Sequence, residues 1–352
     1  MKIIITQLLN NFSGSPNVLS VVAKGLIERG YEVVAITNKS DGFLSTIKGL
    51  KFSYIHYNWN PQNKLISSFS LMFAQIELFF KILFGSRSNI YVVNTILPFG
   101  AAFAAYISWK KNVYYVHENM SQNKSLYAIC RLIYARTNTK SIFVSKYVKS
   151  KGVNVQDSIV AYNGLSEDFL SKIAITPVAE RKTVLMLCSL GTQKGVFEFL
   201  EVAKRMPNMM FELVVGNAQE QVDDFIKSNI VPQNVTIFSF QRNVHPFYQR
   251  ARVVLSMSRP AECVETFGLT LLEGMSYSQP VICPNVGGPI EVVEDGVSGF
   301  CVNPMDIDAV VEKLEVLNDE NVYKVMSEAA YKRSKNFNSN IMIEQIASYI
   351  TK

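Results

Sequence analysis

The sequence predicts an α/β protein built from two doubly wound, Rossmann-like domains. Its 352 residues are long for a single hydrophobic core and suit two domains. Short apolar runs alternate with polar loops and amphipathic helical segments along the chain. Hydrophobic residues make up 48% and charged residues 18%, as in a well-buried globular protein. We expect a first domain over residues 1–168, a linker over 169–182 and a second domain over 183–339, followed by a helix at 340–352.

The first domain opens with a strand at 2–6, a polar loop at 10–16, a helix at 17–29 and a strand at 31–37. This strand–loop–helix–strand order is typical of a dinucleotide-binding fold. Further strands are predicted at 91–94, 112–116 and 141–145. His117 follows the second of these, where open α/β sheets bind ligands, although its position alone equally allows a structural residue that caps the strand.

The second domain is predicted to contain buried strands at 184–188, 211–215, 235–240, 251–257 and 281–283. Asp306 and Asp308 are spaced like a metal-binding pair. They precede an apolar-periodic helix, so we expect one of them to be its N-cap. The last predicted helix, at 341–350, carries an apolar face that needs a packing partner.

A stretch from Val264 to Phe300 holds two glutamates, Glu265 and Glu273, eight positions apart across Phe267-Gly268. The apolar run after Gly268 suits a buried helix, whose first N–H groups favour phosphate. Glu265 would precede this helix, and Glu273 would lie about two turns into it and accept hydrogen bonds from ribose hydroxyls. From spacing alone, the simpler interpretation is that both glutamates are surface charges.

The stretch resembles the donor-site signature of retaining glycosyltransferases of family four, which is Glu, seven residues, Glu, and then Gly-Gly-x-x-Glu. Gly287, Gly288 and Glu291 match the second part. The resemblance extends more weakly over almost the whole chain. It implies the GT-B fold, with two Rossmann-like domains facing across a cleft and a last helix that crosses back onto the first domain.

The resemblance also implies roles for individual residues. Glu265, His117 and Lys194 are the catalytic candidates: Glu265 would orient the sugar hydroxyls, His117 would contact the sugar and Lys194 would neutralise the diphosphate. The candidate donor-binding residues are Glu273, Gly268, Leu269, Phe267, Thr266, Ser189, Asn217 and Gly14. Two positions depart from the family pattern, because Ser189 replaces an arginine and Ser13 replaces the first of two loop glycines. No metal and no cofactor are expected.

The net charge of +6 is unevenly distributed along the chain. Residues 1–175 hold 19 Lys and Arg against 8 Asp and Glu, whereas the remainder is acidic. A basic half suggests an anionic partner, and no nucleic-acid module is recognisable, so an anionic membrane surface or a lipid phosphate is favoured. The aromatic segment 65–84 is interrupted by polar residues, which predicts a buried or interfacial helix rather than a membrane span. The five cysteines are expected to be reduced, and the protein to be cytoplasmic, or peripheral at the inner face of the plasma membrane.

We therefore expect a metal-independent glycosyltransferase of bacterial surface-polysaccharide type. It would transfer a hexose-type sugar with retention from a nucleotide-sugar, UDP being favoured over GDP, to a glycan acceptor that is lipid-linked, as in O-antigen or capsule synthesis. Two alternatives stay open: a sugar-nucleotide epimerase or hydrolase of the same fold, and an inactive relative that still binds nucleotide-sugar.

Overall fold

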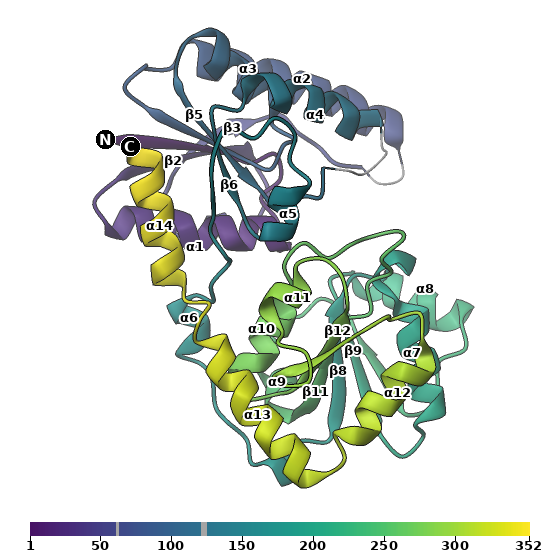
Figure 1. Ribbon diagram of the computed structural model, residues 1–352. Helices are drawn as coiled ribbons and strands as arrows, with labels where there is room; N and C mark the ends of the chain where they lie inside the picture. The colour runs from purple at the N-terminus through teal and green to yellow at the C-terminus, as the bar shows by residue number, and fades with distance from the viewer. Residues whose placement is uncertain (61–62, 121–124) are drawn as a thin grey trace. The chain divides into compact units, whose positions relative to one another are not determined.

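The computed structural model describes residues 1–60, 63–120 and 125–352 (Figure 1). The chain forms two compact units. Unit 1 comprises Met1–Gly164 and Ser339–Lys352, and unit 2 comprises Leu165–Asn338. Each unit is a parallel sheet with helices on both faces, which confirms the predicted pair of Rossmann-like domains.

Unit 1 contains a seven-stranded sheet of order β3-β2-β1-β4-β5-β6-β7, in which every pairing is parallel. The strand order reverses between β1 and β4, and such a reversal point is where open α/β sheets bind ligands. Its strands are β1 (Lys2–Thr6), β2 (Glu32–Asn38), β3 (Lys51–Ile55), β4 (Ile90–Asn94), β5 (Lys111–Val116), β6 (Lys140–Phe143) and β7 (Asp157–Val160). Its helices are α1 (Gly14–Glu28), η1 (Phe43–Thr46), α2 (Lys64–Leu83), α3 (Phe99–Ile107), α4 (Ser125–Thr137), α5 (Lys146–Ser150) and α14 (Ser339–Thr351).

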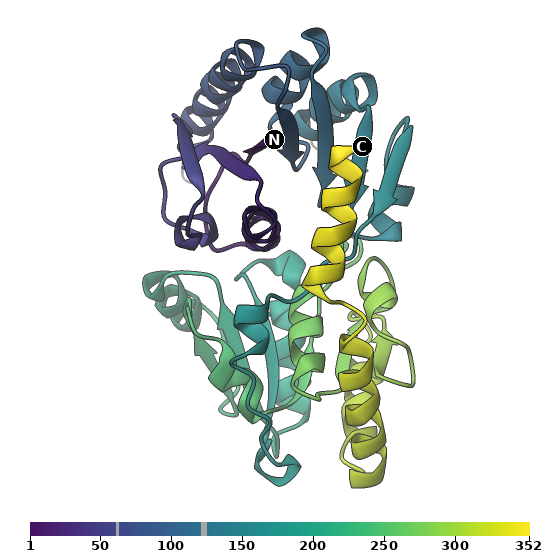
Figure 2. The same ribbon diagram turned by 90° about the vertical axis from the view of Figure 1, so that its left-hand side faces the viewer.

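Helix α14 packs against unit 1, beside α1 (Figures 1 and 2). Gly25 of α1 makes this close approach possible, because a Cβ there would lie 2.4 Å from Cδ1 of Ile343. The Tyr115 hydroxyl also contacts the Met342 sulfur at 3.8 Å. The apolar face of the last helix is thereby buried in the unit that begins the chain.

Helices α2, α3 and α4 cover the other face of this sheet (Figure 1). Helix α2 has the length and composition of a membrane span, with a mean hydropathy of 1.5. It instead buries one side against α3: Ala74, Leu78 and Ile82 are fully buried, and Gln75 bonds to Gly100 N at 2.8 Å and to Leu97 O at 3.2 Å. Its opposite side is exposed and apolar, so α2 is buried on one side only.

Unit 2 contains a six-stranded parallel sheet of order β10-β9-β8-β11-β12-β13, which reverses between β8 and β11. Its strands are β8 (Thr183–Cys188), β9 (Met210–Val215), β10 (Val235–Phe238), β11 (Ala251–Leu255), β12 (Val281–Pro284) and β13 (Gly299–Val302). Its helices are α6 (Glu167–Leu170), η2 (Val178–Glu180), η3 (Thr192–Lys194), α7 (Val196–Arg205), α8 (Gln219–Ser228), α9 (His245–Arg250), α10 (Leu269–Ser276), α11 (Pro289–Val292), α12 (Ile307–Val316) and α13 (Glu320–Ser334).

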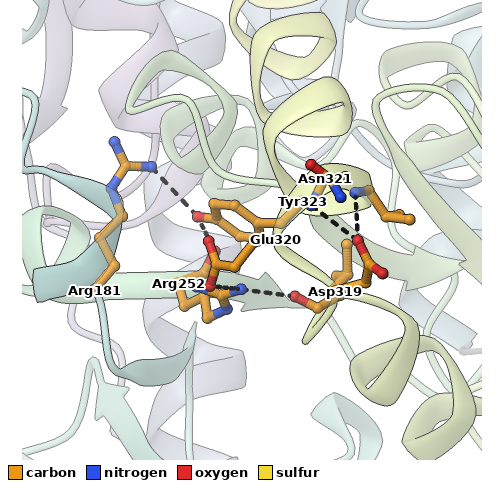
Figure 3. Close-up of polar contacts among 8 residues, drawn as sticks. Arg181, Arg252, Asp319, Glu320, Asn321 and Tyr323 are labelled. Carbon is orange, nitrogen blue, oxygen red and sulfur yellow. Dashed lines mark hydrogen bonds and ion pairs between the residues drawn. The ribbon is translucent and has the colours of Figure 1, made fainter.

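The structure divides the chain after Gly164, so residues 165–182 lie in unit 2, whereas we expected the first domain to end at 168 and a linker to follow. Arg181 explains the packing of this segment. Its side chain is buried and donates to Ser278 O at 2.7 Å. It also donates to the Tyr323 hydroxyl at 3.4 Å (Figure 3). The adjacent Arg252 pairs with Glu320 at 3.0 Å, so the start of α13 is also fixed there.

The predicted helix cap in unit 2 is confirmed for one of its two candidates. Asp306 is the N-cap of α12, and its Oδ1 accepts a hydrogen bond from Ala309 N at 3.1 Å. Asp308 lies in the first turn and pairs with Arg205 instead.

Candidate active site

Two of the predicted catalytic side chains meet at the reversal point of the unit 2 sheet. Lys194 follows β8 and Glu265 follows β11, and their Nζ and Oε2 atoms are 2.8 Å apart. Ser258 Oγ donates to the same carboxylate oxygen at 3.3 Å. Burial alone would lower the pKa of Lys194, but the nearby Glu265 carboxylate outweighs this effect and raises it. Lys194 is therefore a fixed cation whose position depends on Glu265.

The Glu273 side chain is oriented by a tyrosine. It is the fifth residue of α10, so it lies little more than one turn into the helix rather than the two turns expected, because the helix begins only at Leu269. The Tyr248 hydroxyl donates to Glu273 Oε2 at 2.5 Å. Burial raises the pKa of Glu273 to about 7, while the bond from Tyr248 opposes this rise.

The turn before α10 requires its glycine. Gly268 has φ +101°, in the left-handed region, and it forms the N-cap of α10 before Leu269. Phe267 is buried, and its ring packs against Phe337 with ring centroids 5.8 Å apart. Phe267 therefore packs inside the protein and supports the turn, and its role in donor binding stays a prediction.

Gly287 and Gly288, which follow the neighbouring strand β12, pack against the backbone of this turn. Gly288 N donates to Glu265 O at 2.8 Å, and a Cβ on Gly288 would lie 2.1 Å from Thr266 O. A Cβ on Gly287 would lie 2.4 Å from Glu265 O. Both glycines allow the backbone after β12 to pass directly beneath Glu265 and Thr266.

Two other predicted donor-binding residues lie in neighbouring loops, one after β8 and one after β9, which are bonded to one another. Ser189, directly after β8, is exposed. Asn217, two residues after β9, accepts a hydrogen bond from Leu190 N at 2.8 Å and donates to Gln221 at 3.3 Å. These bonds show that Asn217 connects the two loops within the protein.

The remaining candidates lie in unit 1. His117 follows β5, and its Nε2 is 2.9 Å from Asn94 Oδ1, at the end of the neighbouring β4. Burial lowers the pKa of His117 to about 3. Gly14 is the first residue of α1, and apart from its chain neighbours and its own helix backbone no described atom lies within 4 Å of where a Cβ would lie. The fold itself does not require a glycine at this position.

Sequence reasoning missed the residues that orient these groups, namely Tyr248, Ser258, Asn94 and Gln7. Tyr248 lies 25 residues from Glu273, and Asn94 lies 23 residues from His117. No spacing rule connects them, because sheet order rather than local periodicity brings them together. Within the described residues, no group of three His, Cys, Asp or Glu could hold a metal ion; metal independence stays a prediction.

Comparisons with known proteins agree with this architecture. Residues 171–333 match the family model described as Glycosyl transferases group 1. An uncharacterized glycosyltransferase of Methanocaldococcus jannaschii is 30% identical over 212 residues, which is 58% of this chain and 57% of that protein. The capsular polysaccharide biosynthesis glycosyltransferase CapM of Staphylococcus aureus is 28% identical over 166 residues, 44% of this chain and 42% of that protein. The matched regions thus span about half the length of these two relatives.

Among solved structures, this chain is similar to Anabaena HepE in complex with UDP-glucose, with a TM-score of 0.79 at 19% identity. The match covers 100% of this chain and 99% of the HepE chain. This likeness shows the fold. On the combined sequence and fold evidence, residues 171–333, which make up most of unit 2, are similar to glycosyl transferases group 1, and the chain has the GT-B fold.

Proposed function

We propose that this protein transfers a hexose-type sugar from a nucleoside diphosphate sugar, with UDP favoured over GDP, to a glycan acceptor. The observation that carries the proposal is the pairing of Lys194 with Glu265 at the reversal point of unit 2, beside the turn that starts α10. Lys194 and the first N–H groups of α10 would stabilise negative charge on the departing diphosphate. Glu273 would bind the ribose hydroxyls.

Retention of the anomeric configuration is part of this proposal. The Glu265 carboxylate is engaged by Lys194 and Ser258, which disfavours it as a covalent nucleophile and suits it to orienting sugar hydroxyls. The acceptor hydroxyl would then attack on the face from which the diphosphate leaves. The bond from the anomeric carbon to the diphosphate oxygen breaks, a bond to the acceptor oxygen forms, and the hydroxyl proton passes to the diphosphate.

We further propose that the acceptor is lipid-linked and that unit 1 binds an anionic membrane surface. Helix α2 exposes apolar side chains along one side. Helix α3 and the turn that follows it expose further apolar side chains, and α4 exposes two aliphatic ones. The exposed residues are Leu65, Ile66, Phe69, Met72, Phe73, Ile76, Phe80, Phe84, Phe103, Tyr106, Ile107, Trp109, Ile129 and Leu132. These three helices contain a single acidic residue, Glu77, which bonds to His56. Apolar side chains next to unopposed lysines and arginines are the composition that binds anionic interfaces.

The donor assignment is tested by thermal unfolding with UDP, GDP, UDP-glucose and GDP-mannose. A ligand at about a hundred times its dissociation constant stabilises by roughly 2.7 kcal/mol, which shifts Tm by several degrees. We expect a larger shift with the uridine compounds. Lys194→Ala should reduce UDP affinity about 10- to 100-fold, because a charge-assisted contact contributes roughly 1.5–3 kcal/mol.

Ser189→Arg is the matched gain-of-charge variant and should tighten UDP binding, or at least preserve it. Wild-type affinity in Lys194→Ala would show that the diphosphate binds elsewhere. Release of free sugar without any acceptor would favour a hydrolase, and binding of UDP-glucose without turnover in wild type or Ser189→Arg would favour an inactive relative.

A further inference from the structure

A buried chain of hydrogen bonds in unit 1 leads from β1 to His117. Gln7 follows β1, Asn94 ends β4 and His117 follows β5, and these three strands are neighbours at the reversal point of the sheet. Gln7 is 7% exposed and Asn94 is fully buried. Burial of two amide side chains costs free energy unless their polar atoms are hydrogen-bonded, and both here bond to one another.

The direction of every bond in this chain follows from one backbone carbonyl. Gln7 Nε2 donates to Leu9 O at 3.0 Å, and a carbonyl can only accept. The Gln7 amide oxygen therefore faces Asn94 and accepts from its Nδ2 at 2.7 Å. This leaves Asn94 Oδ1, an acceptor, facing His117 Nε2 at 2.9 Å. Nε2 must carry a hydrogen.

The other ring nitrogen of His117 is then defined as well. Burial lowers the pKa of His117, so the ring is neutral near pH 7 and carries one hydrogen only. Because that hydrogen is on Nε2, Nδ1 has a free lone pair. No hydrogen bond joins Nδ1 to any residue that the structure describes, and the side chain is partly exposed. The Tyr115 ring, 4.3 Å away between centroids, packs against the imidazole.

We propose that Gln7 and Asn94 are positioning residues that hold His117 in its Nε2–H tautomer, so that Nδ1 accepts a hydrogen bond from a sugar hydroxyl. The sugar in this statement rests on the proposed function, whereas the tautomer rests on the hydrogen bonds alone. The other tautomer, or the imidazolium, would present an N–H group to the sugar and reverse the direction of that bond.

The tautomer can be measured in the full-length protein labelled with ¹⁵N-histidine, because the chain contains only three histidines. Long-range ¹H–¹⁵N spectra identify the protonated ring nitrogen, and loss of signals in His117→Gln assigns them. We expect His117 to be neutral, with its hydrogen on Nε2, from pH 7 down to about 5.5. A hydrogen on Nδ1 at pH 7, whether as the other tautomer or as imidazolium, overturns the inference.

Two variants test the role of the amide chain. Asn94→Ala should give a mixture of tautomers and reduce turnover of UDP-glucose about tenfold, the effect of one lost hydrogen bond. Asn112→Ala is the control, since it removes another buried amide from the adjacent strand, and it should leave both readouts unchanged. If Asn94→Ala fails to fold, Asn94→Asp retains the acceptor but should raise the pKa of His117, so that Nδ1 protonates at a higher pH than in wild type.

The outcomes separate this inference from the proposed function. An unchanged His117 spectrum in Asn94→Ala or Asn94→Asp contradicts the positioning role, whatever the enzyme does. An Nε2–H His117 together with failure to bind or turn over UDP-glucose contradicts the proposed donor instead. UDP-glucose, but not UDP, should move the Nδ1 resonance; equal shifts with both probes would show that Nδ1 does not contact the sugar.

Discussion

Glu273 shows how a buried carboxylate keeps one oxygen available for a ligand. The Tyr248 hydroxyl donates to Oε2, while no residue that the structure describes bonds to Oε1, so Oε1 is the atom suited to accept from ribose hydroxyls. Only the ionised form can accept with both oxygens. Because burial raises the pKa of Glu273 to about 7, a fraction of the free protein is protonated at neutral pH.

Binding of UDP-glucose should therefore strengthen as pH rises through about 7. Below this pH, ligand binding must first remove the proton from Glu273, and the affinity falls. Tyr248→Phe removes the hydrogen bond that lowers the pKa of Glu273, so the midpoint of the pH dependence of UDP-glucose affinity should move to higher pH. Isothermal titration from pH 5.5 to 8.5 measures both effects. Glu273→Gln is the control: it should bind about tenfold more weakly at pH 8 and lose the pH dependence, since a neutral amide has no proton to release. The same midpoint in wild type and Glu273→Gln would contradict this assignment.

At the scale of elements, the predicted strands were those with long apolar runs. Strands β1, β4, β5, β8, β9 and β12 are buried on both faces of their sheets, and their sequences show this. The strands β3 and β7 at the edges of unit 1 were not predicted, because these partly exposed strands mix polar and apolar residues. Strand β13, at an edge of unit 2, was not predicted either, because it is only four residues long and begins with a glycine. Strands β10 and β11 end two residues earlier than predicted, since apolar side chains continue into the loops.

The sequence predicted functional roles for several glycines, but only the structure shows which of them the packing of the protein itself requires. Gly288 is required by the protein itself, because its Cβ would overlap Thr266 O, whereas the fold leaves space for a Cβ at Gly14. The sequence shows a glycine after a strand in both cases, and it cannot distinguish a glycine required by close backbone packing from one required by the approach of a ligand. The sequence likewise cannot show whether Phe267 contacts a ligand or packs inside the protein; in the structure its side chain packs inside the protein and supports the turn before α10.

Gly288→Ala and Gly14→Ala should therefore behave differently. Gly288→Ala must displace the turn that carries Glu265, so we expect a lower Tm and at least tenfold weaker UDP binding. Gly14→Ala should leave Tm within about 1 °C of wild type, because no described atom beyond its chain neighbours and its own helix backbone is near the added methyl group. If the α1 loop approaches a substrate, Gly14→Ala lowers transfer without loss of stability. Thermal unfolding and steady-state kinetics measure both variants, and a destabilised Gly14→Ala would contradict this account of the loop.

At the scale of the whole molecule, the two units differ in charge. Unit 1 contains 19 Lys and Arg against 7 Asp and Glu, whereas unit 2 contains 16 against 22. The exposed apolar side chains of α2 lie in the basic unit. The sequence located both features, but it could not show which side of α2 is buried, because both sides of the helix are apolar and only its packing on α3 distinguishes them.

The membrane proposal predicts that unit 1 carries the protein to anionic vesicles. In flotation with phosphatidylglycerol-containing liposomes, the wild type should float at 50 mM salt and much less at 1 M, where the Debye length is about 3 Å. Phe69→Ser combined with Phe73→Ser, which removes two exposed rings from α2, should weaken binding at least tenfold. Each lysine neutralised near the membrane, such as Lys64→Gln, should weaken it about fivefold.

A matched control comes from unit 2, where Ile230 is 94% exposed and Val325 is 69% exposed. Ile230→Ser combined with Val325→Ser removes the same kind of apolar surface from the acidic unit, so flotation should be unchanged. Equal loss in both double variants would indicate general hydrophobic adsorption rather than a defined surface. A wild-type protein that stays at the bottom of the gradient at 50 mM salt would contradict membrane attachment, and a soluble glycan would then be the acceptor to test.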